Sequence, residues 1–343
     1  MLFGRKPLAP IRPAPLPADA HVRVVSPSWP FLVYVPTRVA AGERALERLG
    51  FTVSYGRHAF SVTDDGVSAG SADMRAHDLM DAFLDEEVDA LLSAGGGMSS
   101  SELLPLLDFD LIARHPKPFV GHSDNAYLHA SLASRAELVS YYGVGLVAHL
   151  GEPHGALEET LRWFDAAVRG ADALVLEPAK RRASARVNWH APSPSPPRLD
   201  RTGGASVLRE GEAVGPLLGA ELSILPDVLA CAEIDPNGAL LFWDLGPHTR
   251  EPLEVLWRRF CERITVCELG AMLVGPHPTI PDAEWALLVH SVVQDDVADS
   301  EFPIIVNVDC GHVHPVWTIP FGAVGKASTS PCQVVVSSNM PGA

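Results

Sequence analysis

The sequence predicts an α/β protein of two domains, with a parallel-sheet domain in its first half and a second α/β domain after it. Short apolar segments alternate in both halves with amphipathic segments of about 10–15 residues, which is typical of β-α-β units. The halves are separated by a basic and then Pro/Ser-rich segment without periodicity. We expect a flexible arm at 1–20, an N-terminal domain at 21–177, a linker at 178–204 and a C-terminal domain at 205–343.

In the first half, strands are predicted where apolar residues cluster, and helices where apolar residues recur every three or four positions. The predicted strands are 22–25, 51–55, 89–94, 118–120 and 138–142. The predicted helices are 37–49, 72–84, 101–107, 157–168 and one that begins after Asp124. Ligands of parallel sheets bind at the carboxyl ends of the strands. Two polar turns follow predicted strands there, GGGMSSS at 95–101 and GHSD at 121–124.

The second half continues the alternation of strands and helices. The predicted strands are 239–243, 271–274 and 304–308, and the predicted helices are 251–263 and 283–293. Residues 215–220 lead into a turn and a further predicted helix within 219–230. The remainder is expected to form short strands and turns. Within the linker, Trp189 would be able to close over a ligand, since long loops are often functional. The alternative for this segment is a solvated connector.

Composition and charge exclude several classes of partner. The formal net charge of −16 argues against a nucleic-acid backbone or an anionic membrane as the main partner. No segment approaches the roughly 18 apolar residues of a membrane helix. The first 20 residues lack the apolar core of a signal peptide, so we expect a cytoplasmic protein. The five cysteines show no CxxC spacing, which argues against a disulfide framework or a structural zinc site.

Ser123 lies where a short apolar strand turns sharply into a helix. A serine at such a turn stands clear of both elements, and the first N–H groups of the helix have no partner within the helix. Those donors are able to hold the oxygen of a tetrahedral intermediate. The turn therefore suits a nucleophile, although Asn125 replaces the second glycine of the G-x-S-x-G elbow. The alternative is that Ser123 only caps the helix.

Three further segments carry residue types that suit chemistry. The glycines at 95–97 would allow an anion nest, or they only line a turn. Asp309, Cys310, His312 and His314 are of types that bind metals, but they fall within one short segment without a partner set elsewhere. A histidine acting as general base is the better use of this segment, and a structural histidine is the alternative. Asp244 ends a strand and would either orient a histidine or simply end the strand.

These segments, in this order and approximate spacing, resemble the LD-carboxypeptidase family of serine peptidases over roughly residues 20 to 325. The likeness is closest to the microcin C self-immunity branch, which has a GGMNSNSLLPYID-like segment, a GYSD elbow and a DCCHTHPM-like histidine segment. The resemblance implies an N-terminal α/β domain with the nucleophile and a C-terminal α/β domain with a barrel-like sheet. The active site would lie between them, usually in a homodimer.

If the roles of the family's residues are carried over to this sequence, the resemblance implies that Ser123 is the nucleophile, His312 the base and Asp244 the acid. The oxyanion donors would be the N–H groups of Gly97 and Asp124. The resemblance implies neither a metal nor an organic cofactor. We expect substrate contacts from the glycine-rich turn and from residues around the cleft. These are Gly96, Met98, Ser99, Glu221, His248 and Trp189.

The chain departs from the family pattern at the acid and at a carboxylate pocket. The family's acid is the Glu of an ILFLED-like strand, so Asp244 is shorter by one methylene, about 1.5 Å of reach. Either the backbone moves in or the triad is looser. The family's GGNL turn is GAEL here, which places Glu221 where an Asn sits, and a Lys is replaced within 246–248. We therefore expect a substrate with a neutral or cationic group, rather than a free carboxylate, near the scissile bond.

The sequence as a whole predicts a serine hydrolase that cleaves an amide in a small peptide-like molecule through an acyl-enzyme. The microcin likeness suggests detoxification of a peptidyl-nucleotide antibiotic, or tailoring of a related metabolite. Three alternatives stay open. They are murein LD-carboxypeptidase activity, an acyl-serine cyclase or acyltransferase, and a protein that binds a ligand without turning it over.

Overall fold

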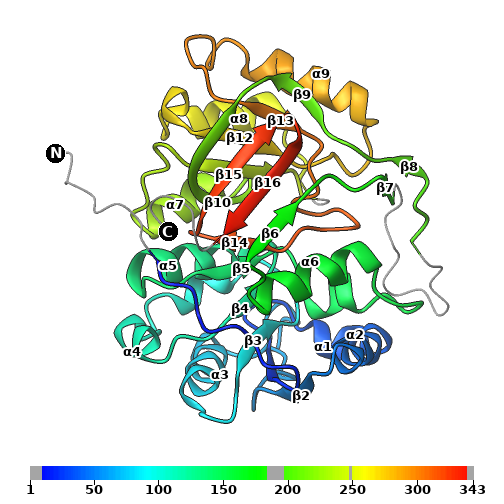
Figure 1. Ribbon diagram of the computed structural model, residues 1–343. Helices are drawn as coiled ribbons and strands as arrows, with labels where there is room; N and C mark the ends of the chain where they lie inside the picture. The colour runs from blue at the N-terminus through cyan, green and yellow to red at the C-terminus, as the bar shows by residue number, and fades with distance from the viewer. Residues whose placement is uncertain (1–9, 184–196, 247–248, 338–343) are drawn as a thin grey trace.

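The computed structural model describes residues 10–183, 197–246 and 249–337, and its strands form two large sheets (Figure 1). The first sheet has six strands, in the order β14-β5-β4-β3-β1-β2. Their bounds are β1 (His21–Val25), β2 (Thr52–Tyr55), β3 (Ala90–Ser93), β4 (Phe119–Gly121), β5 (Ser140–Tyr142) and β14 (Ile319–Phe321). Strands β1 to β5 are mutually parallel, and β14 pairs antiparallel with β5. This is the parallel sheet that the first half predicts.

The second sheet has eight strands, in the order β6-β16-β15-β10-β11-β12-β13-β9. Their bounds are β6 (Ala173–Leu176), β9 (Ser206–Arg209), β10 (Glu212–Glu221), β11 (Leu240–Asp244), β12 (Ala271–Val274), β13 (Ile304–Val306), β15 (Val324–Thr329) and β16 (Cys332–Ser337). The strands from β10 to β13 are parallel and the others pair antiparallel. A separate two-stranded antiparallel sheet consists of β7 (Arg181–Arg182) and β8 (Arg201–Thr202), which lie before and after residues 184–196 in the chain.

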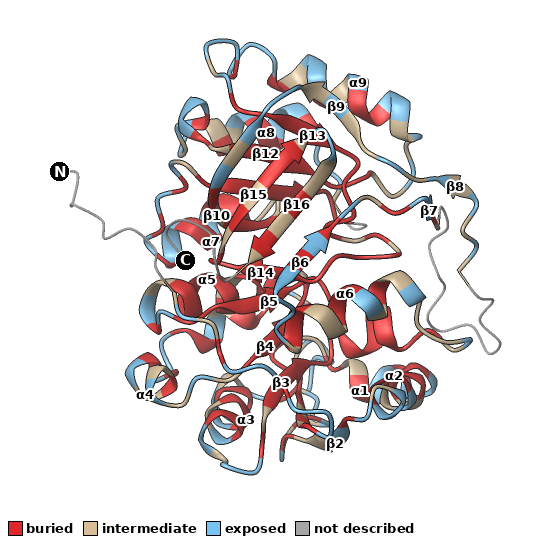
Figure 2. Cartoon of the chain, in the orientation of Figure 1, coloured by how far each residue is buried: buried red, intermediate tan, exposed pale blue. Residues whose placement is uncertain are grey.

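Helices cover both sheets, and the strands between them are largely buried (Figure 2). The α-helices are α1 (Phe31–Tyr34), α2 (Pro36–Arg48), α3 (Ala72–Leu84), α4 (Phe109–Arg114), α5 (Ala126–Arg135), α6 (Glu158–Val168), α7 (Leu225–Cys231), α8 (Leu253–Cys261) and α9 (Asp282–Val293). Short helical turns are η1 (Ser100–Leu103), η2 (Ser123–Asn125), η3 (Leu146–Leu150) and η4 (Val266–Glu268). In α8 the buried residues recur three or four positions apart, which is why this segment forms an amphipathic helix.

Most predicted elements are confirmed, and two local predictions are wrong. The helix expected at 101–107 is only the short turn η1, and α4, which follows it, was not predicted. Residues 10–20 do not form a free arm, because Ile11 pairs with Leu138 and the Leu16 N–H donates to the Val168 carbonyl. In addition, no element was predicted at 173–176, where the structure has the edge strand β6.

Strands exchanged between the halves hold the two sheets together. Strand β6 comes from the first half of the chain but pairs with β16, and β14 comes from the second half but pairs with β5. The carboxyl ends of β4 and β11 thereby meet between the two sheets, where His312 bonds both to Ser123, just after β4, and to Asp244, the last residue of β11. Ser123 and the glycine-rich turn follow β4 and β3, Glu221 and Asp244 end β10 and β11, and His312 follows β13.

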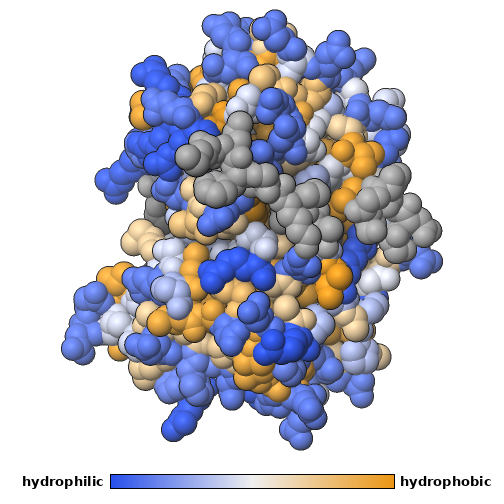
Figure 3. Space-filling model, turned by 90° about the vertical axis from the view of Figure 1, so that its left-hand side faces the viewer, coloured by the Kyte–Doolittle hydropathy of each residue, from blue (hydrophilic) through white to orange (hydrophobic). Residues whose placement is uncertain are grey.

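The surface gives little information on partners. Within the described ranges, no helix is both long enough and apolar enough to cross a membrane. On the face shown in Figure 3, small apolar patches are separated by hydrophilic side chains. The predicted homodimer and the domain bounds stay predictions.

Candidate active site

Ser123 is held in a strained turn between β4 and η2. Its φ is 61°, in the left-handed region that residues with a side chain seldom adopt. Such a backbone turns the side chain away from both the strand and the following helix. Gly96 lies directly against it, because a Cβ added at Gly96 would come within 2.6 Å of the Ser123 Cβ. A glycine is therefore required at residue 96 for the two turns to approach.

The hydroxyl of Ser123 meets a histidine from the other half of the chain. Ser123 Oγ lies 3.1 Å from Nε2 of His312, and Nδ1 of His312 lies 2.7 Å from Oδ2 of Asp244. The same carboxylate oxygen accepts the backbone N–H of His312 at 2.9 Å. A proton on Nδ1 is thus fixed by Asp244, which leaves Nε2 free to accept one from Ser123.

The short acid reaches the histidine because the backbone of the histidine segment approaches it. Gly311 has a φ of 80°, and a Cβ added there would overlap the carboxyl group of Asp244. A Cβ at Gly275 would come within 2.9 Å of the Asp244 Cβ. Two glycines therefore allow the chain to close around Asp244. The sequence left two outcomes open for the shorter acid, a closer backbone or a looser triad. The close approach of the backbone and the 2.7 Å hydrogen bond agree with the first.

The environment of His312 favours its protonated form. Burial lowers the pKa of its imidazole, but the attraction and hydrogen bond of Asp244, together with the charge of Glu221, outweigh burial and raise it above its ordinary value. A raised pKa strengthens a base that must accept a proton from a hydroxyl. It also means that His312 loses its own proton only at a higher pH than an ordinary histidine.

The glycine-rich turn at 95–101 is fixed beside Ser123 by hydrogen bonds to its own backbone. Ser28, in the loop after β1, accepts the N–H groups of Met98 and Ser99 at 2.9 and 3.0 Å. Its hydroxyl donates to Oδ2 of Asp124 at 2.8 Å, and the same oxygen accepts the Ser100 N–H at 3.0 Å. The buried Asp124 carboxylate thus ties the turn to the nucleophile elbow.

The backbone N–H groups of Gly97 and Asp124 have no acceptor within the described parts of the chain. Both belong to turns that border Ser123, so they are available to an oxygen that develops charge there. Burial raises the pKa of Asp124, against the effect of the hydrogen bonds from Ser100 and Ser28. The side chain of Asp124 is therefore a structural clamp, and its predicted contribution is through its N–H group.

Sequence reasoning did not find two residues that support this turn. Ser28 follows β1 at the carboxyl edge of the sheet, and that position is the signal that would have found it. Arg75 is buried on α3, and its guanidinium donates to the carbonyls of Pro27, Ser99 and Gly70. Nothing in the sequence around Arg75 indicates this contact.

Three buried imidazoles surround the proposed base. The ring of His122 lies 4.5 Å from that of His312 and 4.7 Å from that of His149, and His149 lies 5.0 Å from His314. Burial and the neighbouring imidazoles lower the pKa of His122 and His149 well below the ordinary value. Burial lowers that of His314 to about 4. The cluster is therefore neutral near pH 7, so the positive charge that forms during catalysis would be confined to His312.

The remaining predicted contacts divide by location. Glu221 ends β10 and faces Asp244 across the parallel pair β10–β11. Met98 is 86% exposed, so its side chain is accessible to a ligand. Ser99 is buried, and its hydroxyl bonds to Ser28, Ser68 and Arg75, so its contact with substrate stays a prediction. Trp189 and His248 lie outside the described residues.

Asp309 and Cys310, which shortly precede His312 in the chain, bond to residues other than His312. Asp309 accepts the Arg182 Nε at 2.5 Å and the Ala179 N–H at 2.6 Å. Cys310 is buried, with its Sγ 3.8 Å from the Trp243 carbonyl oxygen. These contacts leave the segment without a converging set of metal ligands. Within the described ranges, only His58, His77 and Asp78 bring three potential ligand atoms together.

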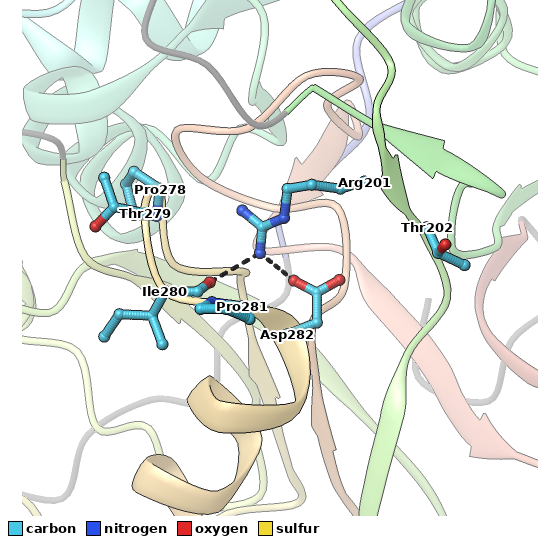
Figure 4. Close-up of a pocket in the computed structure, with 7 residues that line it drawn as sticks. All are labelled: Arg201, Thr202, Pro278, Thr279, Ile280, Pro281 and Asp282. Atoms are coloured by element: carbon cyan, nitrogen blue, oxygen red, sulfur yellow. Dashed lines mark hydrogen bonds and ion pairs between the residues drawn. The ribbon is translucent and has the colours of Figure 1, made fainter.

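A pocket of about 380 Å³ opens beside this segment rather than at Ser123 (Figure 4). Arg201 crosses it and donates to the Ile280 carbonyl at 3.0 Å and to Asp282. Asp282 also pairs with Arg182, which joins the pocket wall to Asp309. Neither Ser123, Asp244 nor His312 lines this pocket. We therefore locate the candidate site by its hydrogen bonds and not by this cavity.

Two family models match the chain on either side of the central segment. The model of the LD-carboxypeptidase N-terminal domain matches residues 22–143, and that of the C-terminal domain matches residues 214–326. The first range contains Ser123 and the second contains Asp244 and His312. The chain belongs to the LD-carboxypeptidase family. The family resemblance of the sequence is thereby confirmed, and the protein is a member of a family of peptidases, which are hydrolases.

Curated relatives and solved structures extend the match to nearly the whole chain. The microcin C7 self-immunity protein MccF of Escherichia coli is 23% identical over 317 residues, covering 91% of this chain and 92% of the relative. The murein tetrapeptide carboxypeptidase of Pseudomonas aeruginosa is 25% identical over 307 residues, covering 89% and 92%. The wild-type apo structure of MccF superposes with a TM-score of 0.86 at 22% identity, covering 96% and 99%. The two-domain α/β fold is confirmed by this superposition.

Proposed function

We propose that the protein is a serine hydrolase that cleaves an amide bond in a small peptide-like molecule through an acyl-enzyme. The observation that carries the proposal is the continuous line of hydrogen bonds from Asp244 through His312 to Ser123, at 2.7 and 3.1 Å. The line joins residues from both halves of a chain that belongs to a peptidase family.

In the acylation step, Oγ of Ser123 attacks the amide carbonyl carbon while Nε2 of His312 takes its proton. The carbonyl oxygen becomes an oxyanion, which the N–H groups of Gly97 and Asp124 would hold. Asp244 keeps Nδ1 of His312 protonated and stabilises the imidazolium. The amide C–N bond then breaks, and His312 gives its proton to the leaving nitrogen. An acyl ester on Ser123 and a free amine result.

In the deacylation step, His312 takes a proton from water as the water oxygen attacks the ester carbonyl. The C–O bond to Ser123 breaks, and the serine recovers its proton from His312. The products are a carboxylic acid and the amine released earlier, so the net reaction adds one water. No metal and no organic cofactor take part in these steps.

The relatives support a proposal for the substrate class. MccF has been crystallised with aspartyl sulfamoyl adenosine and with glutamyl sulfamoyl guanosine, and another relative is a murein tetrapeptide carboxypeptidase. We propose a small peptidyl or aminoacyl compound, with a peptidyl-nucleotide in self-immunity or metabolite tailoring as the first candidate. We further propose a homodimer from the family resemblance, and a cytoplasmic protein with domains at 21–177 and 205–343 from the sequence pattern.

The test is the mass of the products. Acylated dipeptides and aminoacyl sulfamoyl nucleosides are incubated with the protein and with Ser123→Ala, and the reactions are followed by liquid chromatography and mass spectrometry. We expect cleavage products whose summed mass exceeds the substrate by one water, absent in Ser123→Ala. A cyclised or transferred acyl product without added water would contradict hydrolysis. Turnover by Ser123→Ala at the same rate would contradict the nucleophile.

A further inference from the structure

Glu221 carries a negative charge next to the proposed catalytic acid. It is the last residue of β10, and its Cα is the register partner of Asp244 at the end of β11. Strand β10 also lies against η2, which begins with Ser123. The side chain of Glu221 is half-buried, so it is neither fully hydrated nor sealed from a ligand. Its charge acts on two neighbours, because it raises the pKa of His312 and that of Tyr142.

Two hydroxyl groups hold the Glu221 carboxylate in place. Ser223 donates to Oε1 at 2.7 Å, and Thr249 donates to the same oxygen at 2.5 Å. A Cβ added at Gly246 would overlap Oε2, so the backbone after β11 also closes against this side chain. Hydroxyl donors fix a carboxylate without neutralising it. The carboxylate is thus oriented by its neighbours.

The described residues around Glu221 place no lysine or arginine against its carboxylate. No lysine or arginine in the described ranges forms an ion pair with Glu221, Asp244 or Asp124. The nearby buried cation, Arg38, pairs with Glu152 at 2.5 Å. His312 is already bonded to Asp244. The described residues beside Ser123 therefore present the carboxylates of Glu221 and Asp244 without a lysine or arginine paired to either.

We propose that Glu221 is the anionic half of a subsite for a cationic substrate group, such as a primary ammonium, close to the scissile amide. The inference rests on the proposed hydrolase function and adds the charge of the substrate to it. An ammonium donates up to three hydrogen bonds, and the oriented Glu221 oxygens would accept them. A free carboxylate at the same place is repelled by Glu221 and Asp244. The protein therefore selects an amine-bearing peptide-like compound over a peptide acid.

The test uses three ligands that differ only in one terminal group. These are the N-acetylalanine amides of ethylenediamine, propylamine and β-alanine, which end in an ammonium, a methyl group and a carboxylate. Each is measured by its ability to slow the labelling of Ser123 by a fluorophosphonate probe at pH 7. This readout reports binding and does not require that the ligand be cleaved. The variants are Glu221→Gln, Glu221→Lys and, as control, Glu212→Gln, which removes a carboxylate from the exposed end of the same strand.

We expect the ammonium ligand to protect at a concentration about tenfold or more below the carboxylate ligand, as a charge-assisted hydrogen bond would give. The preference should vanish in Glu221→Gln, reverse in Glu221→Lys and persist in Glu212→Gln. Stronger protection by the carboxylate ligand, no protection by any of the three, or an order unchanged in Glu221→Gln would overturn the subsite. An absence of labelling in the unmodified protein would instead overturn the proposed nucleophile, so the two failures are distinct.

Discussion

Replacing Gly311 by alanine perturbs the contact that compensates for the short acid. Gly311 has a φ of 80°, so alanine there costs about 1–2 kcal/mol of backbone strain. Its Cβ would also overlap the carboxyl group of Asp244, which must then move. Both hydrogen bonds from His312 to Asp244, at 2.7 and 2.9 Å, depend on that position.

The loss of an orienting acid in a serine triad reduces turnover by up to about 10⁴-fold. Because Gly311→Ala displaces the acid without removing it, we expect Ser123 to react with a fluorophosphonate about 10²- to 10⁴-fold more slowly. Gly238→Ala is the matched control, since Gly238 has a φ of 71° and nothing within 4 Å of the added Cβ. It should lose similar stability in urea unfolding and keep the labelling rate. Labelling of Gly311→Ala within threefold of the control would refute the role of this contact.

Three further predictions concern the base, the turn and the core. The rate of Ser123 labelling should rise with pH through the raised pKa of His312, because only neutral His312 accepts a proton. Glu221→Gln should move this rise in the pH–rate profile to lower pH, and a profile that does not move would contradict the electrostatic argument. Ser28→Ala should slow labelling by about tenfold or more, because it removes the hydrogen bonds that hold the turn with the proposed oxyanion donors. A labelling rate equal to that of the unmodified protein would count against a role of this turn. Glu152→Leu should destabilise the fold by about 3–5 kcal/mol in urea unfolding, because it removes the carboxylate that pairs with the buried Arg38. Adding Arg38→Met should restore much of the loss, and no restoration in the double variant would contradict pairwise coupling.

The sequence predicted the elements whose periodicity is local and missed those that depend on the other half of the chain. The helix at α2 and the strand at β3 follow from their own apolar spacing. The edge strand β6 was missed because it is stabilised by pairing with β16, far away in the sequence. Short strands of this kind carry little signal of their own.

The candidate site shows the same division. Ser123, Asp244 and His312 stand at strand ends and turns, where residue type and position together indicate chemistry, and the structure brings them into contact. Ser28 and Arg75 act through hydrogen bonds to the backbone of a distant turn, which no local pattern encodes. The buried side chain of Ser99 could not be told from an accessible one, because its neighbours come from three separate segments.

The most direct measurement is the site of covalent labelling by a fluorophosphonate, determined by intact mass and peptide mapping. The account predicts one adduct per chain, on the peptide that contains Ser123, and no adduct in Ser123→Ala. It also predicts a strongly reduced rate in His312→Gln, a variant that keeps a side chain of similar polarity without the base. An adduct that persists in Ser123→Ala, or an unmodified protein that does not react at all, would contradict the claim that Ser123 is an activated nucleophile.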